Sequence, residues 1–206
     1  MRYSARGGNP VDVSSPISTV IPSLDGPVLA CLAATTAPLG LAQIHRQVGH
    51  GSKSGVRQVL LRMKNTGIIS EIPGGFVLNR SHITAQAVEI LADLHGELIR
   101  RIRSAINTWK SEVLLVGLFG SAARRDGNSS SDIDILIVSE AQDLRELADQ
   151  LASQVTAWTG NPAQIVAINR KELKRLQQAK EPIVAHWQSE LVVISGDVRI
   201  LTSSSK

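Results

Sequence analysis

Residues 119–138 read Phe-Gly-Ser-Ala-Ala-Arg-Arg-Asp-Gly-Asn-Ser-Ser-Ser-Asp-Ile-Asp-Ile-Leu-Ile-Val, and this stretch decides the fold. The apolar residues 113–119 predict a buried strand, a polar connection rich in turn formers follows, and residues 133–138 predict a second strand. Successive side chains of a strand point to opposite faces, so Asp132 and Asp134 are expected on the same face. Two carboxylates therefore converge at one strand end.

The carboxylate pair predicts a metal site beside a phosphate site. Like charges a few ångströms apart raise each other's pKa, and a divalent cation relieves this cost. Asp132 and Asp134 suit Mg2+, which is held by one or two carboxylates together with substrate phosphates. The backbone at Gly120 can approach a ligand closely, and the amides and hydroxyl from Ser121 onward can donate to phosphate oxygens. The alternative is that both aspartates cap backbone amides and face water.

This arrangement resembles the nucleotidyltransferase superfamily that includes DNA polymerase beta, and its small minimal members in particular. Their signature is Gly-Ser, a spacer of about ten residues and Asp-x-Asp. Here the matching residues are Gly120, Ser121, Ala123, Arg124, Ser131, Asp132 and Asp134, within a resemblance that spans roughly residues 110 to 195. The resemblance implies that Asp132 and Asp134 are catalytic and bind Mg2+. It also implies that a nucleoside triphosphate is bound by Gly120, Ser121, Arg124 and Ser131.

One position departs from the resembled pattern. Active members carry a third carboxylate on a later strand, where it acts as general base or completes a two-metal site. The matching stretch here is Asn161–Ile168, which places Gln164 at the expected position of the acid, and no Asp or Glu lies between Asp149 and Glu172. A neutral amide cannot accept a proton. Slow transfer, transfer to an already acidic nucleophile, and nucleotide binding without turnover all stay open.

Composition indicates two small domains. The chain has 206 residues, of which 43% are hydrophobic, and a net charge of +4. Residues 1–80 carry eight Lys and Arg against three Asp and Glu, whereas residues 81–206 carry 14 against 15, so the positive charge belongs to the first part. Cys31 is the only cysteine, which excludes an intrachain disulfide. No segment has the apolar length of a membrane span or a signal peptide, so we expect a cytoplasmic protein.

The N-terminal part resembles a winged helix-turn-helix domain over residues 25–80. A flexible tail is expected before it at residues 1–24, with a short apolar segment around Val20-Ile21 that packs against another part of the protein. Helices are predicted over residues 25–34, from Leu41 to Val48 and over residues 53–65, and a hairpin around Gly74-Gly75 follows. In this family the third helix enters the major groove of double-stranded DNA. The DNA face would contain Ser52, Lys53, Ser54, Arg57, Gln58 and Arg62. The alternative is a protein-interaction or dimerisation module whose basic helix faces solvent.

The remaining sequence predicts a long helix and an α/β (α+β) domain. Residues 81–110 have apolar positions at three- and four-residue steps, with Ser81 as N-cap, which predicts a long helix. This helix could link the two domains or join two subunits in a homodimer, and the alternative is a core helix of the second domain. Residues 111–206 alternate strands with helices, as in a nucleotidyltransferase fold with a small mixed sheet. Helices are expected over residues 143–159, 171–178 and 182–189, and a last strand over residues 191–194.

Two functions are consistent with the sequence. The first is a DNA-binding protein whose second domain binds Mg-NTP and transfers a nucleoside monophosphate to a hydroxyl of a protein, an RNA or a small molecule. A protein acceptor would fit the family members that are paired with toxins. The second is a transcriptional regulator whose transferase fold is weak or inactive and serves nucleotide sensing or dimerisation, and Gln164 favours this interpretation.

Overall fold

The computed structural model describes residues 16–109, 113–126 and 131–202. Contacts along the chain divide it into two compact units, with Ser15–Glu97 in one unit and the chain from Leu98 onward in the other. Within the described residues, no helix is both long enough and apolar enough to cross a membrane.

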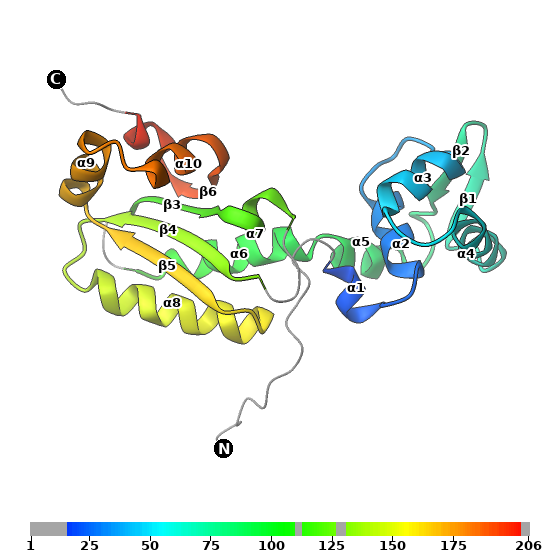
Figure 1. Cartoon of the computed structure of the whole chain (residues 1–206). Coiled ribbons are helices and arrows are strands. Elements are labelled where there is room, and N and C mark those ends of the chain that lie inside the picture. Colours follow the sequence, from blue (N-terminus) through cyan, green and yellow to red (C-terminus); the bar gives the residue numbers. More distant parts are fainter. Residues whose placement is uncertain (1–15, 110–112, 127–130, 203–206) are drawn as a thin grey trace, which may run out of the picture. The chain divides into compact units, whose positions relative to one another are not determined.

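The N-terminal unit contains three helices and a hairpin at the predicted places, with one helix added on each side (Figure 1). Local signals explain the central helix bounds, because Ser52 accepts a hydrogen bond from the Gly55 amide at the start of the third predicted helix, and Gly49 ends the preceding helix at φ 74°. The elements are α1 (Ile17–Val20), α2 (Asp25–Ala33), α3 (Leu41–Val48), α4 (Lys53–Asn65), β1 (Ile69–Ile72), β2 (Gly75–Leu78) and α5 (Ala85–Ala92). One buried hydrophobic cluster holds all of the helices together with both strands.

The prediction of a flexible tail over residues 1–24 is wrong for its last third, where only the expected packed apolar segment is correct, since Ile21 packs against the core and Val20 is exposed. The helix α1 lies there, and Ile17 is buried in the hydrophobic core of the unit. An apolar side chain that leaves water in this way stabilises the segment against the core. Residues 1–15 of the predicted tail lie outside the described residues.

The prediction of one long linking helix over residues 81–110 is also wrong. The structure has two helices there, α5 and α6 (Leu94–Ile106), and α5 begins at Ala85, well after Ser81. Asp93 lies between them with non-helical φ and ψ, and its carboxylate accepts a hydrogen bond from the Gly96 amide. This bond caps the start of α6, which the apolar periodicity did not reveal. The premise for a homodimer through one continuous apolar stripe is therefore lost.

The second unit is built on a four-stranded mixed sheet in the order β5-β4-β3-β6. β4 pairs antiparallel with β3 and parallel with β5, and β6 pairs antiparallel with the other edge of β3. The parallel pair is joined by the crossover helix α8, as a βαβ connection requires. The elements after α6 are β3 (Val113–Phe119), α7 (Gly120–Arg124), β4 (Ile133–Ser139), α8 (Leu144–Thr159), β5 (Ala163–Ile168), α9 (Arg170–Gln178), α10 (Pro182–Glu190), β6 (Val192–Gly196) and η1 (Val198–Leu201).

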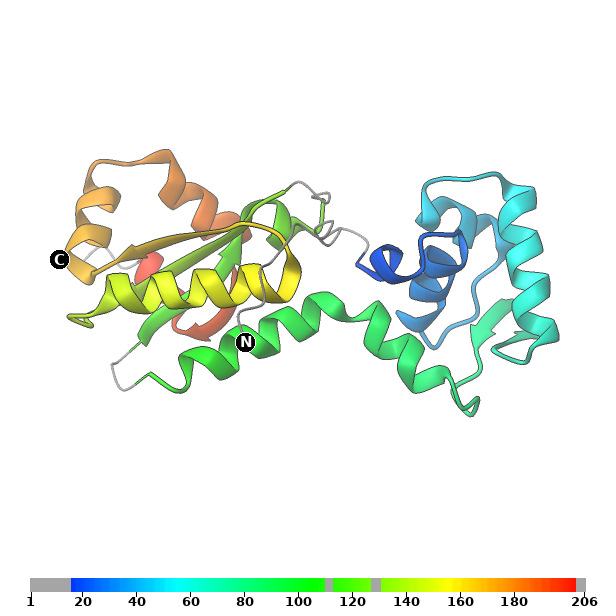
Figure 2. The same cartoon turned by 90° about the horizontal axis from the view of Figure 1, so that it is seen from below.

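Both faces of this sheet are buried, which explains the nearly continuous apolar run of β4. Ile133, Ile135 and Ile137 point to the layer formed by α6 and α8. Leu136 and Val138 point to the layer formed by α9, α10 and η1. Figures 1 and 2 show these layers on opposite sides of the strands. The predicted α/β class with a mixed sheet is confirmed, whereas the short helix α7 stands where a turn was expected.

An ion pair in the N-terminal unit predicts a pH-dependent stability. Arg62 on α4 donates to Asp25 at the start of α2, and the Ser23 hydroxyl donates to the same carboxylate at 2.7 Å. Partial burial opposes ionisation of Asp25, but these hydrogen bonds outweigh it and hold the pKa of Asp25 below its ordinary value. The pair therefore stabilises the folded state above the unfolded-state pKa of about 3.9, and this stability is lost as the pH falls through the lowered pKa.

We expect Asp25→Asn to lower the free energy of unfolding by less than about 1 kcal/mol at pH 7, because the Arg62 side chain is 58% exposed to screening water. The difference from wild type should shrink as the pH falls below the unfolded-state pKa of about 3.9, in urea titrations followed by circular dichroism. Glu71→Gln removes the Lys64 pair, whose carboxylate is twice as exposed as that of Asp25, so it is the control and should change stability less. A loss for Asp25→Asn that does not shrink with falling pH would contradict the assignment.

Candidate active site

Asp132 and Asp134 lie at the start of β4, one before and one within the strand. In the register of the sheet, Asp134 is opposite Phe119 at the end of β3 and level with Gln164 on β5. Asp134 has the same strand parity as Leu136, which faces α10. Asp134 therefore lies on the α10 side of the sheet, at the end of β4 where the two carboxylates were predicted to converge.

Gly120 lets the turn after β3 approach Asp134. Its φ is 67°, in the left-handed region that favours glycine, and a β-carbon built on it would lie 2.5 Å from the Asp134 Oδ2 atom. No other residue type satisfies both the backbone angle and the space. The predicted close approach at Gly120 is therefore present, and the group that approaches is the carboxylate of Asp134.

The backbone around Asp132 is held by two residues of the turn before β5, Asn161 and Pro162, which were not among the predicted site residues. The Ile133 amide donates to the Pro162 carbonyl at 2.8 Å, and the Asn161 side-chain amide donates to the Ser131 carbonyl at 3.0 Å. Asn161 is fully buried. These two bonds flank Asp132 and set where its side chain leaves the backbone. The Gly-Asn-Pro turn before β5 is the local signal that could have identified them.

Gln164 lies beside the carboxylate pair. It projects from β5 level with Asp134, and its side-chain amide donates a hydrogen bond to Asp132 Oδ2. The amide thus orients one carboxylate of the pair but offers no proton acceptor of its own. Within the described residues, no group of three or more His, Cys, Asp and Glu side chains is placed to hold a metal ion.

Arg124, the last residue of α7, is held by two carboxylates. Its guanidinium donates to Asp126 Oδ2 at 2.9 Å and to Glu190 Oε2 at 2.7 Å. The other oxygen of Glu190 accepts a hydrogen bond from the Gly120 amide at 3.3 Å. Glu190 is the last residue of α10 and was not among the predicted site residues. No local signal marks it, because its partners lie about 70 positions earlier in the chain.

Electrostatic interactions link these groups. Burial raises the pKa of Asp134 above its ordinary value, and the negative charges of Asp132 and Glu190 raise it further, while Arg124 opposes the shift. The hydrogen bond from Arg124 instead holds the pKa of Glu190 below its ordinary value. Hydrogen bonds to Asp126 and Glu190 raise the pKa of Arg124. The site thus contains the Asp134 carboxylate, which resists ionisation, and the Arg124 cation, which is bound by the carboxylates of Asp126 and Glu190.

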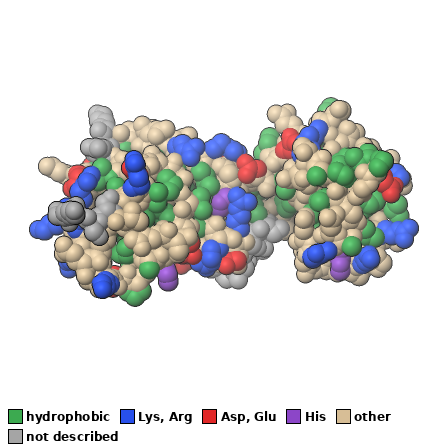
Figure 3. Space-filling model, turned by 90° about the horizontal axis from the view of Figure 1, so that it is seen from above, with side chains coloured by type: hydrophobic (Ala, Val, Ile, Leu, Met, Phe, Trp, Pro, Cys, Tyr) green, Lys and Arg blue, Asp and Glu red, His purple; other side chains and the backbone are tan. Residues whose placement is uncertain are grey.

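Two further residues were predicted to bind phosphate. Ser121 is half-buried in α7, and the Ser131 carbonyl accepts the hydrogen bond from the Asn161 side chain. The six predicted DNA-face residues all lie on α4 or at its N-cap and are exposed. Three of them are engaged within the protein: Ser52 caps the helix, the Ser54 hydroxyl contacts that of Ser52 at 3.0 Å, and Arg62 binds Asp25. Figure 3 shows Lys and Arg side chains dispersed over the visible face of each unit.

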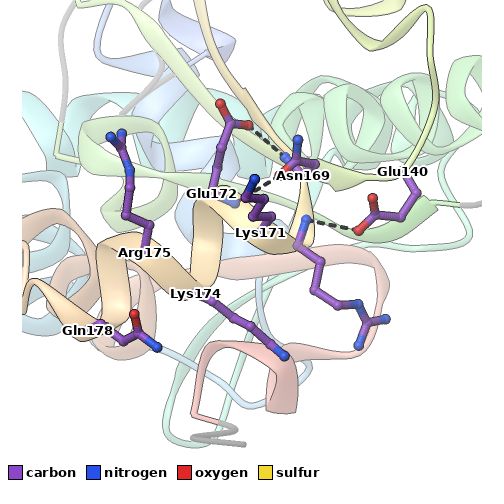
Figure 4. Close-up of a pocket in the computed structure, with 8 residues that line it drawn as sticks. Glu140, Asn169, Lys171, Glu172, Lys174, Arg175 and Gln178 are labelled. Atoms are coloured by element: carbon purple, nitrogen blue, oxygen red, sulfur yellow. Dashed lines mark hydrogen bonds between the residues drawn. The ribbon is translucent and has the colours of Figure 1, made fainter.

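A large surface hollow of about 960 Å³ lies at the opposite end of β4 and β5 from the carboxylate pair. It is formed by Glu140 and by α9 with its N-cap, and it includes four cationic side chains (Figure 4). Both of its carboxylates are engaged, since Glu140 accepts from the Arg170 amide and Glu172 from the Asn169 amide. Strand length separates this hollow from Asp132 by about 20 Å. It is therefore not part of the carboxylate site.

Gly120→Ala should destabilise the protein more than the same replacement at a left-handed glycine in open space. The left-handed backbone alone costs about 1–2 kcal/mol for a residue with a β-carbon, and at Gly120 the contact with Asp134 adds to it. Gly49→Ala is the matched control, because Gly49 has φ 74° and a β-carbon built on it would meet nothing within 4 Å. Urea unfolding of both variants provides the comparison. Equal losses would show that Asp134 does not lie against Gly120.

Similarity to known proteins covers the part of the chain that contains this site. Residues 101–184 match the family described as "Polymerase beta, Nucleotidyltransferase". No curated protein matches the sequence.

Solved structures resemble half of the chain at low identity. One is described as a toxin-antitoxin with AMP-PNP, with 15% identity, a TM-score of 0.39 and coverage of 50% of this chain and 77% of that one. Another is a tri-AMPylated Shewanella oneidensis HEPN toxin in complex with MNT antitoxin, with 14% identity, a TM-score of 0.35 and coverage of 50% and 73%. A third is the toxin-antitoxin MntA-HepT, with 15% identity, a TM-score of 0.34 and the same coverage. By the family match, residues 101–184 form a nucleotidyltransferase domain of the polymerase beta type.

Proposed function

We propose that the second unit transfers a nucleoside monophosphate from Mg-NTP to a hydroxyl acceptor. The observation that carries this proposal is the placement of Asp132 and Asp134 at one end of β4, with the Gly120 turn against them. The family match over residues 101–184 supports the same reaction class. Candidate acceptors are a hydroxyl of a protein such as a toxin partner, an RNA end and a small-molecule hydroxyl such as that of an antibiotic.

The residues present fit Mg2+. Asp132 and Asp134 offer the hard oxygen ligands that this ion prefers. Burial and mutual repulsion raise the pKa of Asp134, and a divalent cation would remove that cost. Two carboxylates are too few for a complete coordination shell, so phosphate oxygens of the substrate would supply further ligands. Bound Mg2+ would offset the negative charge that develops on the phosphoryl oxygens during transfer.

The other site residues have roles that follow from their positions. The Gly120 amide, the Ser121 hydroxyl and the Arg124 guanidinium are donors for the triphosphate oxygens, and Ser131 directly precedes Asp132. In the reaction the acceptor oxygen forms a bond to the α-phosphorus, the bond from that phosphorus to the bridging oxygen breaks, and pyrophosphate leaves with the bond electrons. The acceptor proton goes to solvent or to the leaving group.

Gln164 favours a second function for the same fold. Its amide donates to Asp132, so this position orients a ligand of the metal without removing a proton from the acceptor. A domain that binds Mg-NTP without turnover could act as a nucleotide sensor in a transcriptional regulator. Transfer and sensing share the binding step and differ only in the release of pyrophosphate.

We expect Asp132→Asn and Asp134→Asn each to abolish Mg-dependent NTP binding, because each removes a charged ligand of the metal. The measurement is calorimetric titration with ATP, CTP, GTP and UTP in Mg2+. Labelled NTPs incubated with candidate acceptors then report transfer, with pyrophosphate release as a second readout.

Asp149→Asn, an exposed substitution of the same type on α8, is the control and should bind nucleotide like wild type. Binding that survives both site substitutions would contradict the metal assignment. Binding by wild type without label transfer or pyrophosphate release would leave the sensor as the function of the domain and reject the enzyme.

For the N-terminal unit we propose a winged helix-turn-helix that binds double-stranded DNA. The proposal rests on the order of three helices and an antiparallel hairpin, and on the exposure of Lys53, Arg57 and Gln58 along one side of α4. Arg and Gln suit base edges, and Lys suits phosphates. Arg62 is a weaker candidate than the sequence indicated, because Asp25 holds it. A protein-interaction module is the alternative.

Lys53→Ala combined with Arg57→Ala should weaken DNA binding and reduce the salt dependence of the affinity. Each lost phosphate contact lowers the slope of log K against log salt by about 0.9. Fluorescence anisotropy with a labelled promoter fragment of the gene, at several salt concentrations, provides the measurement. Arg145→Ala combined with Lys171→Ala removes the same charge from the other unit and should have no effect. Equal affinity for both double variants would exclude α4 from a DNA interface.

A further inference from the structure

The carboxylate of Glu190 occupies the donors that the proposed function assigns to nucleotide phosphates. One oxygen accepts from the Gly120 amide at 3.3 Å and the other from the Arg124 guanidinium at 2.7 Å. A phosphate oxygen and a carboxylate oxygen compete for such donors, because both are anionic acceptors of similar geometry. Glu190 lies beyond the segment that matches the nucleotidyltransferase family, which ends at residue 184.

The position of Glu190 is built into the packing of α10. Trp187, one turn earlier on the same helix, is fully buried and meets the ring of Phe119 edge-on at 6.1 Å between centroids. Gly117 on β3 leaves room for Leu191, because a β-carbon there would lie 2.6 Å from the Leu191 Cγ atom. These contacts fix the end of α10 beside the turn that follows Phe119.

The side chain of Glu190 lies at the end of α10 and is partly exposed. It is 20% exposed, and its carboxylate is held by the bonds to Arg124 and Gly120. Rotation of the side chain would release both donors without moving α10, since Trp187 and Leu191 hold the helix. Arg124 would keep its bond to Asp126 at 2.9 Å during the exchange.

We propose that Glu190 is a placeholder for nucleotide phosphate, a residue whose carboxylate a polyphosphate must displace from Gly120 and Arg124. The proposal rests on the proposed function. Without nucleotide, Glu190 accepts hydrogen bonds from the Arg124 guanidinium and the Gly120 amide and keeps both donors in position. It also places a negative charge near Asp134, so displacement removes a repulsion from the carboxylate pair when the metal and the triphosphate arrive. The cost of displacing Glu190 lowers the affinity of every ligand that uses these two donors.

The test is calorimetric titration of the full chain with Mg-ATP and with Mg-tripolyphosphate, for wild type, Glu190→Gln and Glu190→Ala. Without the competing carboxylate, both ligands should bind about tenfold more tightly, which corresponds to one charge-assisted hydrogen bond. Glu181→Gln, at the other end of α10, is the matched control and should bind as wild type does.

The outcomes separate this inference from the proposed function. Wild type that binds Mg-ATP, with Glu190 variants that bind it equally or more weakly, overturns the placeholder and leaves the nucleotide site standing. Absence of binding in wild type and in every variant overturns both. If Glu190→Ala does not fold by circular dichroism, Glu190→Asp replaces it, because one methylene less withdraws the carboxylate, and tighter binding is again the expected result.

Discussion

The carboxylate of Asp134 lies so close to the α-carbon of Gly120 that no side chain fits between them, and the arrangement of the site depends on this approach. It brings the turn after β3 and the start of β4 to one place, although residues 127–130 between them lie outside the described residues. Donors for anions and ligands for a cation thereby meet at one end of the sheet. The positive φ at Gly120 and the raised pKa of Asp134 are the two costs of this arrangement.

The packing of the sheet explains why the start of β4 is exposed to ligands while the rest of the strand is not. Helices cover both faces, so the middle of the strand is buried on each side. Only the strand start, with Asp132 and Asp134 half-buried, keeps polar side chains beside solvent. α10 ends at the same point, because Trp187 is buried one turn before its last residue. α10, which covers one face of the sheet, thus also places Glu190 in the site.

Local signals made much of this structure predictable from sequence. The bounds of α4 match the predicted ones because Ser52 caps the helix and a polar turn precedes it. The strand pattern around Asp132 and Asp134 predicted their common face because a two-residue period needs no tertiary information. The break at Asp93 was missed because the apolar period of α5 and α6 continues across it, so that the cap was the only sign of two helices.

The partners of the site could not be predicted, because they come from distant parts of the chain. Glu190 reaches Gly120 only after β6 pairs with β3 and α10 packs beside them. Asn161 reaches the backbone beside Asp132 only through the parallel pairing of β4 and β5. Arg124 was expected to face phosphate, and the structure shows it bound to carboxylates that no sequence pattern links to it.

In the proposed function, a divalent metal and a triphosphate bind together at the start of β4. Paramagnetic broadening by Mn2+, read in amide NMR spectra with and without a non-hydrolysable NTP analogue, tests this claim most directly. We expect strong broadening at Gly120, Ser121 and the residues around Asp132 and Asp134 when the analogue is present. Broadening centred on Glu140 and α9, or none at the start of β4, would contradict it.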